Sequence, residues 1–83
     1  MKFKKGDYVK FVKYIKGINE DDNYAETICK YLGQVGIIEG KIDNGGYDYP
    51  VKLVDGKAYN FRADELQKIK KADYDEHIVE REI

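Results

Sequence analysis

Apolar and polar side chains alternate along several short stretches of the chain, and this pattern predicts β-strands. In residues 8–14, for example, Lys10 separates Val9 from Phe11. Successive side chains of a strand point to opposite faces of a sheet, so such a stretch buries one face and exposes the other. Applied to the whole chain, the same reasoning predicts five strands, at residues 8–14, 34–42, 47–54, 57–62 and 67–70.

Glycine-containing turns separate several of these predicted strands. Residues 43–46 (DNGG) and 55–56 (DG) supply the positive φ angles that tight hairpins need. Residues 63–66 predict one helical turn, of the 3₁₀ type, before the last strand. Within the strands, Gly36 indicates a bulge or a bend, and Pro50, which lacks an N–H group, indicates an unpaired edge or a bulge.

A short helix is predicted between the first two strands. Four apolar residues recur there at three- and four-residue spacing: Tyr24, Ile28, Tyr31 and Leu32. Asn23 and Glu26 have the spacing of a capping box, and Gly33 favours the end of a helix. The alternative is a long irregular loop that its apolar residues fix to the core.

Five short strands, hairpin turns and one helical turn before the last strand, in this order, resemble an SH3-like β-barrel. Residues 5–11 (KGDYVKF) resemble the opening strand of many such domains, and residues 33–38 (GQVGII) resemble the second strand of KOW-type barrels. Residues 49–66 resemble the second half of small SH3-like modules found in bacterial and prophage proteins.

This resemblance implies an all-β fold, a five-stranded barrel over residues 1–71 with a helical insertion at 18–32. An acidic tail at 72–83, helical or disordered, follows the barrel. Several prophage proteins of this layout have no assigned function, so the resemblance implies a fold rather than an activity. The chain has no Trp, unlike peptide-binding SH3 domains, and acidic residues interrupt the basic surface that KOW modules carry, so neither ligand class transfers.

The size and composition of the chain limit what it can do. A domain of 83 residues buries only about 60% of the surface of its unfolded chain, which leaves little room for an enclosed active site. No apolar run approaches the roughly 18 residues that a membrane helix needs. Cys29 is the only cysteine, so no internal disulfide can form, and we expect a reducing, cytoplasmic setting.

Residues suited to catalysis or metal binding are few. Cys29 and His77 are the only Cys and His, and no third group can be identified that would orient them as a nucleophilic pair. The alternative is that Cys29 packs in the protein and His77 is solvated. Zinc and calcium spacings are absent, and Gly45 lies between two predicted strands rather than before a helix, so no phosphate loop is indicated. We expect no enzymatic activity, no metal and no cofactor.

Protein binding is the function that the tyrosines favour. The chain has eight tyrosines, more than so small a barrel can enclose, and Tyr is common at interfaces because it is amphipathic. The predicted contact residues are Tyr14, Tyr24, Tyr31, Tyr49, Glu20, Asp21 and Asp22. The expected role is an adaptor, or an inhibitor of a host protein, and the resemblance to prophage proteins implies that a phage encodes it. The alternative is that the tyrosines only cover the ends of the barrel.

RNA or single-stranded DNA binding is the second prediction. Residues 1–18 carry six lysines and one aspartate, whereas residues 73–83 carry five acids and one arginine. In the first strand, Tyr8, Lys10 and Tyr14 share the outward face, and Lys13 adds a further positive charge, an arrangement that suits stacking on bases and contacts with phosphates. The alternative is a lysine-coated face that prevents aggregation. The isoelectric point near 5.8 counts against nucleic acid.

Overall fold

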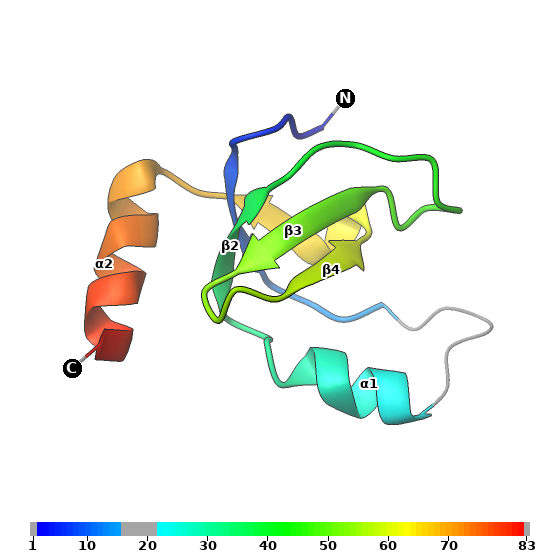
Figure 1. The fold of residues 1–83 in the computed structure, drawn as a ribbon, viewed down its shortest axis with the longest axis horizontal. Coiled ribbons are helices and arrows are strands. Elements are labelled where there is room, and N and C mark those ends of the chain that lie inside the picture. Colours follow the sequence, from blue (N-terminus) through cyan, green and yellow to red (C-terminus); the bar gives the residue numbers. More distant parts are fainter. Residues whose placement is uncertain (1, 16–21, 83) are drawn as a thin grey trace.

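Five strands form the centre of the protein, and Figure 1 shows how they are arranged. The computed structural model describes residues 2–15 and 22–82. The strands are β1 (Tyr8–Phe11), β2 (Val35–Ile38), β3 (Tyr49–Leu53), β4 (Ala58–Phe61) and β5 (Leu66–Lys68). They form one sheet in the order β4-β3-β2-β1-β5, in which all neighbours are antiparallel. The sheet curls around the core as half of a barrel.

Two helices and a 3₁₀ turn complete the fold. They are α1 (Asp22–Cys29), η1 (Ala63–Glu65) and α2 (Lys71–Glu82). Figure 1 shows α1 and α2 at different sides of the sheet, with α2 following the last strand. Of the two states predicted for the tail, the structure has the helical one. The fold is therefore mostly strands, as predicted, with more helix than the sequence analysis expected.

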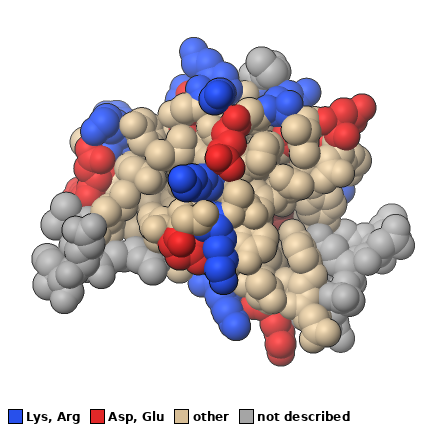
Figure 2. Space-filling view, in the orientation of Figure 1, with Lys and Arg blue, Asp and Glu red and all other residues tan. Residues whose placement is uncertain are grey.

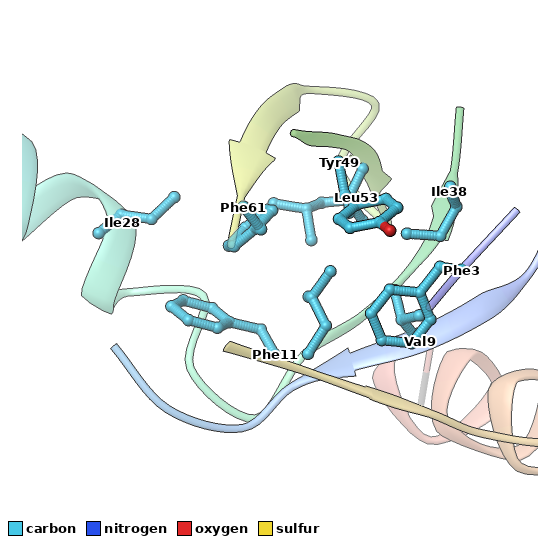
Figure 3. Packing of buried hydrophobic residues seen from close by; sticks show 10 residues of the cluster. Phe3, Val9, Phe11, Ile28, Ile38, Tyr49, Leu53 and Phe61 are labelled. Atoms are coloured by element: carbon cyan, nitrogen blue, oxygen red, sulfur yellow. The ribbon is translucent and has the colours of Figure 1, made fainter. Parts of the chain in front are cut away.

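The buried side chains confirm the predicted alternation most clearly in β1 and β3. The core consists of Phe3, Val9, Phe11, Ile28, Ile38, Tyr49, Val51, Leu53, Phe61 and Leu66. Figure 3 shows Phe11 and Phe61 facing one another inside the sheet, and their ring centroids lie 4.8 Å apart. Ile28 reaches this core from α1, so the helix is attached to the barrel by an apolar side chain.

The strands are shorter than predicted, and two of the differences have clear causes. The strand predicted at 8–14 ends at Phe11. The next residue, Val12, still donates its N–H to the carbonyl oxygen of Glu65 at 2.9 Å, but the N–H of Glu65 donates to the carbonyl oxygen of Arg62 at 3.0 Å and does not return the bond, so the pairing with β5 stops there. The strand predicted at 34–42 ends at Ile38. The N–H of Glu39 donates to the carbonyl oxygen of Pro50 at 2.8 Å, but Pro50 has no N–H to return the bond, so the ladder stops there.

Gly36 has a different role from the predicted bulge. It pairs in continuous register with Val9 on one side and Leu53 on the other, so β2 has no extra residue at this point. A Cβ atom on Gly36 would lie 2.5 Å from Cγ1 of Val51 and 2.7 Å from the carbonyl oxygen of Lys52. Only glycine therefore lets these two strands approach so closely.

The helix predicted at 24–32 is displaced towards the N-terminus. Asn23 lies inside α1 rather than before it, so the predicted capping box with Glu26 is wrong. After Cys29 the chain continues as tight turns, in which the N–H of Tyr31 donates to the carbonyl oxygen of Ile28 at 3.0 Å. The predicted end at Gly33 marks the end of these turns, where φ is 87°.

Candidate binding groove beside strand β4

A surface hollow of about 380 Å³ lies between α1, strand β4 and the connection from β2 to β3. Its lining residues are Tyr24, Asn44, Tyr47, Ala58, Tyr59 and Asn60. We call this hollow the tyrosine groove. None of the side chains that line it carries a charge, and most of them can both pack against apolar groups and form hydrogen bonds.

Three separate elements bring these residues together. Tyr24 comes from α1, and Tyr59 lies on β4. Asn44 and Tyr47 belong to the turn before β3, where the N–H of Tyr47 donates to the carbonyl oxygen of Asn44 at 3.1 Å. The N–H of Asn44 donates to Oδ1 of Asp48 at 3.0 Å, which closes the turn from its other end. The turn predicted at 43–46 is thus present in the structure, and it provides one side of the groove.

Tyr31 supports the groove from behind Tyr59. The two ring centroids lie 5.4 Å apart, and the hydroxyl of Tyr31 donates a hydrogen bond of 2.7 Å to Oδ2 of Asp55. This bond to the Asp55 carboxylate is the main reason that the pKa of Tyr31 is raised. The pKa of Asp55 is lowered, first by the backbone N–H of Lys57 and then by Tyr31. Tyr31 therefore ties the end of α1 to the turn between β3 and β4.

Arg62 lies at the end of β4, next to the groove. Its guanidinium carbon is 4.8 Å from the ring centroid of Tyr47, in a cation–π arrangement. A Cβ atom on Gly46 would lie 3.2 Å from one guanidinium nitrogen, so glycine at this position leaves space for the arginine side chain. Among the residues that the structure describes, no carboxylate lies within ion-pair distance of Arg62.

The structure places some of the predicted protein-binding tyrosines at the groove and others against the core. Tyr24 lines the groove and Tyr31 supports it. Tyr14 is half-buried and packs against the core. Tyr49 is only 4% exposed, with its ring against Phe3, so the expectation that it lies at the surface is wrong. Tyr49 alternates along β3 with Val51 and Leu53, and the structure buries all three on the same face.

The predicted acidic contact residues cannot be placed beside the groove. Glu20 and Asp21 lie outside the described residues. Asp22 begins α1, and its side chain is also outside what the structure describes.

Five groove residues were not singled out as contact residues from the sequence: Asn44, Tyr47, Ala58, Tyr59 and Asn60. The sequence predicts a turn at 43–46 and a strand at 57–62, which contain or adjoin these residues. No sequence pattern shows that α1 lies opposite this turn and this strand. The groove becomes visible only when the sheet order is known.

The predicted nucleic-acid residues do not form one exposed stripe. Tyr8 is half-buried, and its ring lies 4.8 Å from that of Tyr74 on α2, so one of its faces is covered. Tyr14 lies beyond the end of β1 and packs against the core. Lys10 and Lys13 are exposed. On the face drawn in Figure 2, positive and negative side chains are interspersed rather than segregated.

The structure offers few groups for other chemistry. Cys29 is half-buried at the end of α1 and packs against the core, whereas His77 lies on α2. Within residues 2–15 and 22–82, no three Cys, His, Asp or Glu side chains gather in a way that suits a metal ion. In the same residues, no helix has the length and the apolar character needed to cross a membrane.

Comparisons with known proteins support the fold alone. No family model and no curated protein matches the chain. One similar solved structure is the solution structure of the cyanobacterial cytochrome b6f complex subunit PetP, with a TM-score of 0.62 and 24% sequence identity. The match covers 80% of this chain and 78% of that one. The five antiparallel strands are thus compatible with a small SH3-like barrel, and a closer relation to KOW-type or prophage modules stays a prediction.

Proposed function

We propose that this protein is a non-catalytic module that binds another protein through the tyrosine groove. The observation that carries the proposal is the convergence of three tyrosines and two asparagines in one surface hollow. Tyrosine gives a large, rigid contact area at a small cost in conformational entropy, and asparagine adapts its hydrogen bonds to the partner. Such a combination of side chains is typical of protein-binding surfaces.

The chemical character of the groove favours binding over catalysis. Its lining contains no group that commonly acts as a nucleophile or a general base near neutral pH. Its polar atoms are hydroxyls, amides and backbone groups, which recognise a partner by hydrogen bonds. A cofactor has no part in this proposal.

The similar solved structure supports the proposal by analogy only. PetP is a subunit of the cytochrome b6f complex, so in that case a chain of this fold associates with other proteins. Applied to this chain, the analogy suggests an accessory subunit of a larger assembly. The narrower hypothesis of a phage-encoded adaptor or inhibitor, the cytoplasmic location and the nucleic-acid alternative remain predictions from the sequence.

Site-specific photo-crosslinking tests the proposal. Asn44 is exposed at the groove and Asp73 is exposed on α2, so Asn44→p-benzoylphenylalanine and Asp73→p-benzoylphenylalanine form a matched pair. In lysate of the cells that produce the protein, we expect a discrete crosslinked product from position 44 and none of that mass from position 73.

A second substitution tests whether the product depends on the groove. Adding Tyr24→Ala should remove the crosslinked product from position 44, because Tyr24 forms one side of the groove. Circular dichroism of the double variant serves as the folding control. Equal products from positions 44 and 73, or a product that survives Tyr24→Ala in a folded variant, contradict the proposal.

A further inference from the structure

Strand β4 is an edge of the sheet, because within the described residues only β3 pairs with it. The N–H of Leu53 donates to the carbonyl oxygen of Lys57 at 2.8 Å, which shows that the peptide groups of Lys57 face β3. Hydrogen-bonding direction alternates along an antiparallel strand. It follows from the register that the backbone N–H and C=O groups of Ala58 and Asn60 face away from β3.

The same two residues line the tyrosine groove. The groove therefore contains the free hydrogen-bonding edge of a strand, with Tyr24 on one side and Tyr47 on another. Groups spaced in this way match the backbone of another extended chain, which is the basis of recognition by strand addition. An edge of this kind on a soluble protein is otherwise an aggregation hazard.

Arg62 adds a charge to this edge. Residues 58, 60 and 62 alternate along the chain, so Arg62 continues the series that begins with Ala58 and Asn60. Its Nε atom is buried and has no hydrogen-bond partner within the described residues. Because the ring of Tyr47 lies under the guanidinium, it holds the Arg62 side chain in a position from which the guanidinium can donate hydrogen bonds to a carboxylate.

Building on the proposed function, we propose that the partner contributes an extended segment that pairs with β4 as an additional strand and places an acidic side chain against Arg62. The segment's middle residues lie among uncharged tyrosine and asparagine side chains, so they are themselves uncharged. Backbone pairing provides the affinity, and the Arg62–carboxylate pair fixes the register.

Strand β4 of a second copy does not supply these features. Strand β4 has the sequence AYNF and contains no acidic residue that would meet Arg62. Antiparallel pairing of two copies would also bring the Lys57 end of one β4 to the Arg62 end of the other, where like charges repel. Two β4 strands are therefore poorly matched to one another, and a segment of a different protein is the proposed occupant.

Selection from a displayed library of random linear peptides about 12 residues long, enough to span a strand of ordinary length, tests the proposal. We expect a selected peptide with an acidic residue, bound about tenfold or more weakly by Arg62→Gln, because a charge-assisted hydrogen bond is lost. Lys57→Gln, the same charge change at the other end of β4, should change the affinity by less than about twofold.

Two further measurements report on the backbone pairing. Methylating successive peptide nitrogens should weaken binding at every second position only, since alternate N–H groups of a strand face its neighbour. In the protein, the amide protons of Ala58 and Asn60 should exchange rapidly when free and slowly when the peptide is bound, whereas that of Tyr59, which faces β3, should be protected in both states.

The outcomes separate this inference from the proposed function. Peptides that need Tyr24 but tolerate every N-methylation, or that bind Arg62→Gln unchanged, overturn strand addition and leave protein binding at the groove intact. Peptides that bind elsewhere, no selected peptide, or concentration-dependent protection of Ala58 with a dimer in solution also overturn the inference. Loss of the crosslink at the groove, by contrast, overturns the proposed function itself.

Discussion

Replacing Glu65 with glutamine changes one atom of the interior and tests how β1 is held. Glu65 is 3% exposed. Its Oε2 atom accepts the N–H of Ile15 at 2.9 Å, and its Oε1 atom accepts the N–H of Arg62 at 2.8 Å. The side chain thus connects the segment after β1 to the 3₁₀ turn η1, about fifty positions later in the chain.

The magnitude follows from these two bonds. In Glu65→Gln one carboxylate oxygen becomes an NH₂ group, so one of the two backbone N–H groups faces another donor. A hydrogen bond to a charged group contributes about 1.5–3 kcal/mol, and a buried donor without an acceptor costs a similar amount. We therefore expect the free energy of unfolding to fall by about 2–3 kcal/mol, a large part of the 5–15 kcal/mol that is usual for a domain.

Urea denaturation, followed by circular dichroism, measures this change. With an m-value of about 1–1.5 kcal/mol/M, the midpoint should fall by about 2 M. Asp64→Asn is the matched control, because the Asp64 side chain is 77% exposed and contacts Lys2 only at 3.8 Å. The control should change the free energy of unfolding by less than about 0.5 kcal/mol. Equal effects of the two substitutions would refute the inferred role of the Glu65 carboxylate.

Three further predictions concern other contacts. Gly36→Ala should lower the free energy of unfolding by about 1–3 kcal/mol, since the new methyl group overlaps Val51; an unchanged urea midpoint would show that the strands can separate at no cost. Tyr74→Ala removes the ring that covers Tyr8, so amide exchange in α2 should accelerate while the strands stay protected; uniform acceleration would contradict a locally attached helix. The pKa of Tyr31 is raised in the folded state, so the contribution of Tyr31 to stability is complete below the unfolded pKa of about 10 and is lost as the pH rises through the folded value. The melting temperature of Tyr31→Phe should therefore decline less in alkali than that of the unchanged protein, and an identical decline would contradict the role of the Tyr31–Asp55 bond.

Strand periodicity is what the sequence predicted best. Val9 and Phe11 are buried and Lys10 is exposed, because a side-chain period of two is a local property of extended backbone. Strand ends were predicted less well, because they depend on distant residues. The pairing of β1 stops after Val12 because the N–H of Glu65 bonds to Arg62 instead of returning the bond to Val12, and no pattern near residue 12 contains that information.

The tyrosines of the candidate site also show what the sequence could predict and what it could not. Tyr24 was predicted as a contact residue and lines the groove, whereas Tyr49 was predicted as one and lies in the core. A count of tyrosines predicts that some must be exposed, since a small barrel cannot enclose them all. It does not say which ones, because that depends on the face to which each strand turns its side chains.

The sequence by itself determined the five strands, the turns between them and the single apolar core, because alternation and turn chemistry act between neighbouring residues. Only the tertiary structure decided that β4 is an edge, that α1 lies beside it and that Arg62 rests on Tyr47. These relations join residues far apart in the chain, and they arise from how the elements pack around the core rather than from any local preference.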